Sequence, residues 1–157
     1  MSDSRKLEFD VEAILLSAIC ACMWVSLVTY DPADEIARLP SFLGKFVAID
    51  ASVYPPNAET QNACGWFGAL FAQVMIQSLG IGSVLVTTGL TVLAIWMFRV
   101  QSNYVRASRQ IGWVLLLVGI TAIAALLEMP LPLAPAIGSG GYLGALTATW
   151  LNEHFAL

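Results

Sequence analysis

Residues 65–72 read Gly-Trp-Phe-Gly-Ala-Leu-Phe-Ala, and residues 141–148 repeat the pattern as Gly-Tyr-Leu-Gly-Ala-Leu-Thr-Ala. Five of these eight positions are identical, and two of the other three keep an aromatic or apolar side chain. The first copy leads into a long apolar run that begins at Leu79, and the corresponding position after the second copy is Phe155. The repeat therefore predicts two similar halves, with a further apolar run expected to start at Phe155.

The composition is that of a membrane protein. Hydrophobic residues make up 58% of the 157 residues and charged residues only 11%, whereas a soluble domain carries about 25% charged residues. The formal net charge is −4, and the seven Lys and Arg residues are scattered. Because a nucleic-acid surface needs clustered positive charge, we expect no direct contact between this chain and nucleic acid.

Three uncharged runs have lengths suited to crossing a bilayer, which needs about 20 residues with a range of about 17–25. They occupy residues 13–30, 79–98 and 111–127. The segment before the first run contains several acidic residues, and no small-residue cleavage site precedes Asp31. Both features favour a retained span over a cleaved signal peptide.

Residues 66–98 contain no charge and are too long for one simple span, so we divide them at Gly80 and Gly82. Residues 66–78 form an amphipathic pattern, with glutamines four apart on one face and apolar and aromatic residues elsewhere. A helix of this kind, with aromatic residues at its start, is typical of the membrane interface.

The second copy predicts another interfacial helix over residues 142–155. Its polar stripe is repeated as well, because Thr149 and Glu153 fall where Gln73 and Gln77 fall in the first copy.

Small residues recur four positions apart in both copies. Such spacing lets helix backbones approach closely within a membrane. The resulting candidates for helix packing are Gly65, Gly68, Ala69, Ala72, Gly141, Gly144, Ala145 and Ala148.

The distribution of Lys and Arg predicts the orientation. The N-terminal segment and residues 99–110 carry five of the seven, residues 31–64 carry two, and residues 128–141 carry none. Because cytoplasmic loops are enriched in Lys and Arg, we expect a cytoplasmic N-terminus and an outside loop at 31–64. Within that loop, residues 41–49 could form a short interfacial helix or strand.

These patterns predict an all-α membrane protein with a single membrane domain over residues 1–157. It would contain three transmembrane helices and two interfacial amphipathic helices in two parallel half-repeats. Both halves would start on the cytoplasmic side, unlike the inverted repeats of many transporters.

No catalytic, cofactor-binding or metal-binding pattern is recognisable. Gly44-Lys45 is followed by Phe46 and lacks the upstream glycine of a phosphate-binding loop. With His154 as the single histidine, there is no histidine pair for haem or metal, and the three cysteines lack metal-ligand spacing. We therefore expect no enzyme activity and no cofactor.

An acidic cluster follows the first apolar run. Asp31, Asp34 and Glu35 could bind a cation. A helix start directly after Tyr30 is the interpretation we favour, because Asp and Pro are common in the first turn of a helix.

Three short motifs resemble one known family. They are Tyr30-Asp31-Pro32-Ala33-Asp34, Asn62-x-Cys64-Gly65-x-x-Gly68-Ala69 and Gly140-Gly141-x-x-Gly144. Over most of residues 13–157 the chain resembles the N-terminal four-helix membrane domain of FtsK/SpoIIIE-type DNA translocases. It departs from the family pattern at Thr29, where Ser is usual, and at Glu35, where Pro is usual.

The resemblance implies a bacterial inner-membrane anchor for a cytoplasmic ATPase motor that pumps DNA at the division septum. It also implies contact with the lipid bilayer, homo-oligomerisation and contacts with cell-division membrane proteins. None of the motor's residues lie in these 157 residues, so its ATPase activity is not carried over.

Two alternatives belong to other classes. One is a small membrane subunit of a transporter or channel, in which the repeats form a pore between copies. The other is a membrane scaffold without any link to this family.

Overall fold

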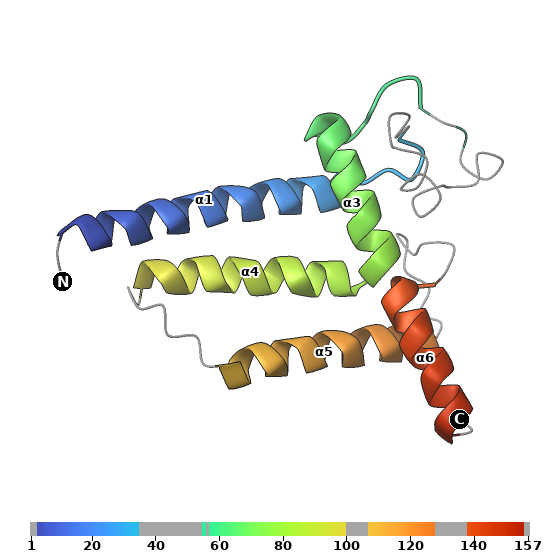
Figure 1. The fold of residues 1–157 in the computed structure, drawn as a ribbon. Coiled ribbons are helices and arrows are strands. Elements are labelled where there is room, and N and C mark those ends of the chain that lie inside the picture. Colours follow the sequence, from blue (N-terminus) through green and yellow to red (C-terminus); the bar gives the residue numbers. More distant parts are fainter. Residues whose placement is uncertain (1–2, 35–54, 56, 100–106, 128–137, 156–157) are drawn as a thin grey trace.

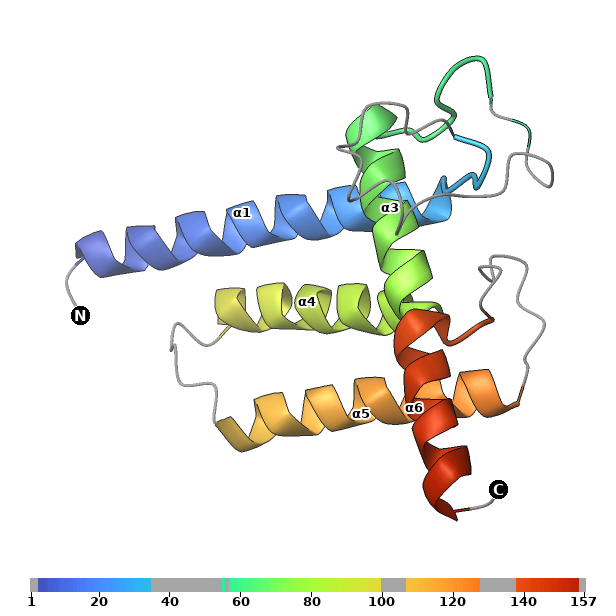
Figure 2. The same cartoon turned by 45° about the vertical axis from the view of Figure 1, so that its right-hand side comes forward.

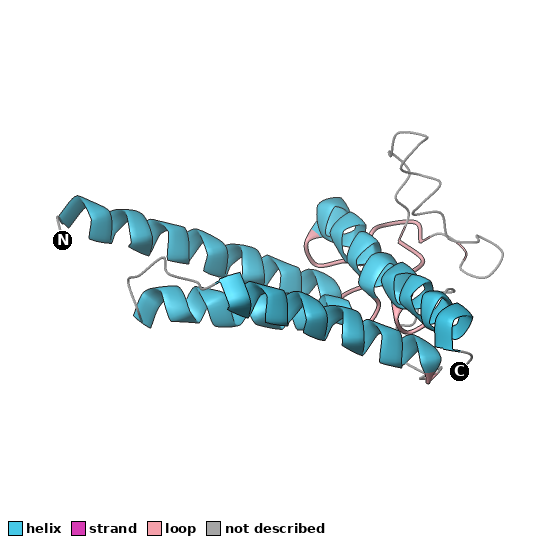
Figure 3. Ribbon diagram, turned by 60° about the horizontal axis from the view of Figure 1, so that its bottom comes forward, coloured by secondary structure: helices cyan, strands magenta, loops and turns pink. Residues whose placement is uncertain are grey.

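The computed structural model describes residues 3–34, 55, 57–99, 107–127 and 138–155. Its helices are α1 (Asp3–Val28), α3 (Gly65–Leu79), α4 (Gly82–Arg99), α5 (Ala107–Leu126) and α6 (Gly141–Phe155). The described residues contain no strand, as the colouring of Figure 3 shows. The all-helical expectation is thereby confirmed, and the alternatives for residues 41–49 lie outside the described residues.

Two of the helices, α1 and α5, extend beyond the apolar runs at their N-terminal ends. α1 begins at Asp3 and α5 begins at Ala107, each within a polar segment that precedes the run. Hydropathy marks the stretch that prefers lipid, whereas backbone hydrogen bonding continues through neighbouring polar residues. α4 begins at Gly82 and not at Leu79, because Leu79 completes the last turn of α3 before the chain bends.

Three helices lie side by side, and two cross one end of them. α1, α4 and α5 form the set of neighbouring rods, with α4 contacting both of the others, and α3 and α6 lie across one end (Figures 1 and 2). The N-terminal end of α1, the C-terminal end of α4 and the N-terminal end of α5 lie at the opposite end. This is the layout expected of spans with surface helices at one face.

Helix length and composition identify fewer spans than the sequence predicts. Among the described residues, length and composition identify Val11–Val28 of α1 as able to cross a membrane. α4 reaches that length only together with α3, and the pair is bent by 113° at the break between them. The apolar part of α5, Ile111–Leu126, is shorter. The count of three spans therefore stays a prediction.

The pattern of burial differs from that of most soluble proteins, although Met23, Leu27 and Ile76 are buried. Small and hydroxyl side chains are buried between the helices, among them Ala13, Cys20, Ser83, Thr87, Ala94 and Thr121. Large apolar side chains face outward, among them Ile14, Leu15, Ile19, Val92, Ile95, Val114 and Leu115. Each of these forgoes about 1.5–3 kcal/mol of burial in water, whereas contact with lipid carries no such cost.

Candidate functional site

The chain turns sharply after α1. Residues 31–34 form a turn in which the Asp34 N–H donates to the Asp31 carbonyl (3.2 Å). The Asp31 carboxylate accepts a hydrogen bond from the Ala33 N–H (2.8 Å), and Pro32 supplies the fixed φ that suits such a turn. The prediction of a helix start directly after Tyr30 is therefore wrong for residues 31–34.

Asp34 fastens this turn to the segment that precedes α3. It is only 5% exposed, and its carboxylate accepts hydrogen bonds from the N–H groups of Gln61 (2.7 Å) and Asn62 (3.0 Å). The Asn57 side-chain amide donates to Asp34 (3.1 Å) and to Asp31 (3.2 Å). These N–H groups surround the carboxylates, and no metal-binding group of three or more acidic, His or Cys residues occurs in the part of the chain that the structure describes.

Asn62 connects the end of α1 to the start of α3. Its side-chain amide donates to the carbonyls of Ser26 (2.9 Å) and Thr29 (3.3 Å), and its side-chain oxygen accepts from the Cys64 N–H (3.0 Å). The last carbonyls of a helix have no partners within it. Asn62, at 4% exposed, supplies such partners and holds the two helices together.

Thr29 takes part in the same junction. Its hydroxyl donates to the Val25 carbonyl (2.7 Å) and accepts from the Ala63 N–H (3.1 Å). The departure from Ser noted at this position therefore keeps the hydroxyl on which both bonds depend.

Gly68 allows α3 to approach this junction. A Cβ atom at Gly68 would overlap the Asn62 side-chain oxygen, the Cys64 Cβ and, at 2.8 Å, the Ser26 hydroxyl. Two motifs separated by about thirty residues thus form the two sides of one contact. We call the set Asp31, Asp34, Asn57, Asn62 and Gly68 the polar junction.

The sequence model of the 4TM region of DNA translocase FtsK/SpoIIIE matches residues 5–157. The chain belongs to this family. The resemblance drawn from the three motifs is confirmed, and it places the polar junction within the membrane region of FtsK/SpoIIIE-type translocases, not within their motor. No curated protein and no solved structure matches the chain.

The turn that opens each surface helix is repeated in this FtsK/SpoIIIE membrane region. The Gly65 N–H donates to the Asn62 carbonyl (2.8 Å), and the Gly141 N–H donates to the Gly138 carbonyl (3.1 Å). Gly65 and Gly141 both have positive φ, 65° and 62°, a conformation that favours glycine. The identity of these glycines in the two copies therefore reflects the same backbone turn.

The second half also fastens its surface helix to the preceding long helix. The Ser139 hydroxyl donates to the Ala124 carbonyl (2.7 Å), two residues before the end of α5, just as Asn62 reaches Ser26 two residues before the end of α1. A Cβ atom at Gly144 would overlap the Thr121 carbonyl. One hydroxyl replaces the acidic and amide groups of the first half.

The predicted packing residues divide into three groups. Gly68, Ala69, Ala72, Gly141, Gly144 and Ala148 are buried, Ala145 is partly exposed and Gly65 is exposed. The buried members pack within one chain: Gly68 against α1, Gly144 against α5, and Gly141 against the α3–α4 break. A Cβ atom at Gly65 would meet nothing within 4 Å, so the positive φ of its turn, and not close packing, accounts for glycine at this position. A role of these residues between copies stays a prediction.

The two halves meet at the break between α3 and α4. The Ile81 N–H donates to the Ser139 carbonyl (2.9 Å). A Cβ atom on Gly141 would lie 2.6 Å from the Gly80 nitrogen and 2.8 Å from the Gln77 carbonyl oxygen. This backbone-to-backbone approach was not predicted from the repeat, because the contacting segments are not equivalent in it.

The polar stripe of the surface helices differs between the copies. Gln73 of α3 is 2% exposed, whereas Thr149 and Glu153 of α6 are exposed. α3 contacts α1, α4 and α6, and these contacts cover its glutamine face. Exposed aromatic or large apolar residues occupy the outer faces of both helices: Trp66, Phe67 and Val74 in α3, and Tyr142, Leu146 and Trp150 in α6.

A second packing stripe was missed. Ser83 and Thr87 are buried in α4, and Thr91 follows at the same spacing of four. The Thr87 and Thr91 hydroxyls bond to carbonyls within α4 (2.9 and 2.8 Å), and the Trp24 indole N–H of α1 donates to the Thr91 hydroxyl (3.1 Å). Small side chains that satisfy their own hydroxyls permit close helix contact in a membrane. The spacing was visible in the sequence.

Proposed function

We propose that this chain is the membrane anchor and helix-association domain of an FtsK-like DNA translocase in the bacterial inner membrane. It would act at the division site, in cell division and chromosome segregation, without catalysis of its own. Membership of the FtsK/SpoIIIE 4TM family supports the proposal. The observation that carries it is the polar junction, in which two of the family motifs fix α3 across the end of α1.

The geometry suits an anchor. We propose that α1, α4 and α5 are three spans and that α3 and α6 lie at the outer surface of the membrane. The N-terminus and the arginines at the α4–α5 end would then be cytoplasmic, in agreement with the excess of Lys and Arg at that end.

We propose that copies of the chain associate and that division membrane proteins bind it. The outward apolar faces of α3 and α6 are the surfaces we assign to these contacts, because they combine aromatic side chains with exposure. They include Trp66, Phe67, Tyr142 and Trp150.

Localisation of the full chain tests this function. A fluorescent protein fused to the N-terminus should concentrate at the division septum. The Asn62→Ala variant, which removes the link between α1 and α3, should lose septal enrichment, and Gln61→Ala, at an exposed neighbouring side chain, should keep it. A stable, membrane-inserted fusion spread evenly around the cell would contradict the proposal, and ion conduction by the purified chain in vesicles would favour the channel alternative.

Thiol labelling tests the orientation. Cys64 is a poor reporter because it is half-buried and its thiol lies 3.7 Å from the Cys22 carbonyl. In a Cys64→Ser background, Ala58→Cys at an exposed site should react with an impermeant thiol reagent in cells whose outer membrane has been removed and whose inner membrane is intact. Ser102→Cys, in the segment between α4 and α5, should react only after lysis. The reverse pattern would exclude a cytoplasmic N-terminus.

A further inference from the structure

Two glycines of α5 have no neighbour that explains them. A Cβ atom at Gly112 or Gly119 would meet nothing within 4 Å, although glycine in the interior of a helix is less stable than alanine. The interior glycines of the other described helices have contacts, because a Cβ atom would meet a neighbouring atom at Gly68, Gly89 and Gly144. Gly112 and Gly119 therefore have no packing role within the part of the chain that the structure describes.

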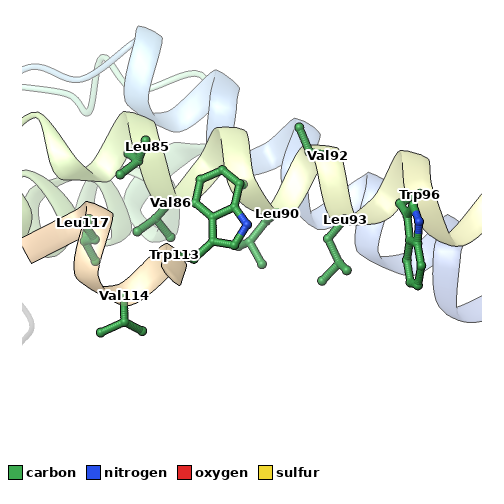
Figure 4. Close-up of a pocket in the computed structure, with 10 residues that line it drawn as sticks. Leu85, Val86, Leu90, Val92, Leu93, Trp96, Trp113, Val114 and Leu117 are labelled. Carbon is green, nitrogen blue, oxygen red and sulfur yellow. The ribbon is translucent and has the colours of Figure 1, made fainter. Parts of the chain in front are cut away.

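The two glycines lie on one face of α5, since residues seven apart return to nearly the same side of a helix. The face continues with apolar side chains that are 39–66% exposed: Leu115, Ile123 and Leu126. The opposite side of α5 faces α4, where Trp113, Val114 and Leu117 line a groove between the two helices (Figure 4). We call the set Gly112, Leu115, Gly119, Ile123 and Leu126 the outer face of α5.

The first half shows how a face of this kind is covered in α1. Ala13 and Cys20, also seven positions apart, are 1% and 3% exposed. α1 contacts α3 and α4, and α3 lies across the C-terminal end of α1 (Figures 1 and 2). α4, the helix that follows α3 in the chain, therefore buries this face of small residues.

The equivalent face of α5 is open. Ser26 and Ala124 occupy the same place in the two halves, because the carbonyl of each accepts the link from the second element two residues before the long helix ends. Counted from these residues, Ala13 corresponds to Ile111, the residue before Gly112. Ala13 is buried, whereas Ile111 is 60% exposed. Among the described residues, the second half therefore has no helix that corresponds to α4.

The path of the chain leads toward this open face. α3 is followed by α4 after a bend of 113°, and the repeat predicts a further apolar run from Phe155, where α6 ends. The C-terminal end of α6 lies past α5, on the side away from α4 (Figures 1 and 2). A helix that left α6 by a similar bend would run beside α5 as α4 runs beside α1.

We propose that the outer face of α5 is the docking surface for a fourth membrane helix, which follows α6 in the chain and corresponds to α4. Gly112 and Gly119 would let the backbone of that helix approach closely. Its attachment to α6 favours it over a helix of a second copy, because a tethered segment is present at a high effective concentration. The description of the family as a 4TM region agrees with a fourth helix and leaves its position open. The inference rests on the proposed topology and adds a packing order: α1, α4, α5 and the fourth helix.

Replacement of one glycine in two lengths of the protein tests the docking. Gly119→Leu is made in the chain of residues 1–157 and in the product of the complete reading frame. In the chain of 157 residues the leucine meets open space, so the unfolding temperature in detergent should stay unchanged or rise. In the longer product the leucine would collide with the fourth helix, and the unfolding temperature should fall by about 2 °C or more.

Ala18→Leu is the matched control. Ala18 is exposed on α1, so the larger side chain should be tolerated in both proteins. The same effect of Gly119→Leu in both proteins would overturn the proposal. A reading frame that stops at Leu157 would overturn it as well.

Crosslinking separates the fourth helix from a second copy as the occupant. Leu115→Cys is introduced into the longer product, with the native cysteines replaced by serine, and membranes are treated with copper phenanthroline. A covered position should give no disulfide-linked dimer. A strong dimer band would assign the outer face of α5 to a second copy and contradict the proposal. Septal localisation is measured separately, so failure of the docking and failure of the anchoring function are distinguishable.

Discussion

Glycine is required at positions 68 and 144 by what each surface helix packs against. Gly68 meets the side chains of Asn62 and Ser26, and Gly144 meets the backbone of α5 at Thr121. A methyl group at Gly68 would have to displace the Asn62 side-chain oxygen, which takes part in the link to α1, and one at Gly144 would collide with the Thr121 carbonyl of α5. Gly112 and Gly119 of α5 are different, because a Cβ atom there would meet nothing within 4 Å.

Replacement by alanine should separate these two classes of glycine. Gly68→Ala and Gly144→Ala should each destabilise the fold by about 1–3 kcal/mol through overpacking. Gly112→Ala, in an open stretch of helix, should be neutral or stabilising by about 0.5–1 kcal/mol. Thermal unfolding of the detergent-solubilised chain measures the difference, and equal effects at all three positions would show that the close approach is not formed.

The fold should need a carboxylate at Asp34, with two oxygens that accept hydrogen bonds, for its full stability. Both of its oxygens accept hydrogen bonds from N–H groups, so the amide of Asp34→Asn must point its own N–H₂ at a donor in either orientation. Loss of hydrogen bonds to a charged group costs about 1.5–3 kcal/mol each. The expected result is a lower unfolding midpoint for Asp34→Asn than for Glu59→Gln, the matching change at an exposed site.

Individual residues were the hardest part of the site to predict. The sequence showed Asp34 and Asn62 as members of two separate motifs, and their contact bridges 28 positions of the chain. Local rules apply within a few residues, which is why the acidic cluster was interpreted as a helix start. Gly65 and Gly141 were predicted as helix-packing residues, and the turn with positive φ that each of them forms became visible only in the structure.

At the scale of elements, α4 shows why a hydropathy profile is incomplete. Its hydroxyl residues lower the mean hydropathy, yet Thr87 is fully buried against the neighbouring helices. Hydropathy predicted that these helices exist, and it placed their apolar parts. It could not predict which face of each helix packs, because in a membrane small and hydroxyl side chains can mark that face, and here they are buried together with Leu27 and Ile76.

Two adjacent threonines test this assignment. Thr87→Leu should weaken the packing of α4 by about 1–3 kcal/mol, because the buried position has no room for the larger side chain. Thr88→Leu places the same side chain on the exposed face and should leave stability unchanged. If the two variants unfold at the same temperature in detergent, the stripe of Ser83, Thr87 and Thr91 is not the contact face.

At the scale of the whole molecule, the two halves differ in how much their opening glycines contact. A Cβ atom at Gly65 would meet nothing within 4 Å, whereas Gly141 lies against the backbone at Gly80, Gln77 and Leu79. The repeat predicted similar halves but not their contact, since a repeat describes each half alone. Docking depends on surfaces that the two copies do not share.

This difference yields a matched pair of variants. Gly65→Ala and Gly141→Ala share the strain of a positive φ, about 1–2 kcal/mol. Gly141→Ala should cost about 1–3 kcal/mol more, because its methyl group collides with backbone that cannot rotate away. The measurement is the difference between their unfolding midpoints, and no difference would mean that the halves do not dock at Gly141.

The sharp bend between α3 and α4 has a mechanical consequence. In the proposed topology, a motor that translocates DNA on the cytoplasmic side would exert a force on the anchor, directed toward the cytoplasm. Because α3 runs across the bundle end at 113° to α4, extraction would have to straighten that corner and drag Asp31 and Asp34 through hydrocarbon. Each buried charge would cost roughly 2.5–3.5 kcal/mol. Single-molecule pulling from the cytoplasmic end should therefore show a higher rupture force for the intact chain than for the Asn62→Ala variant.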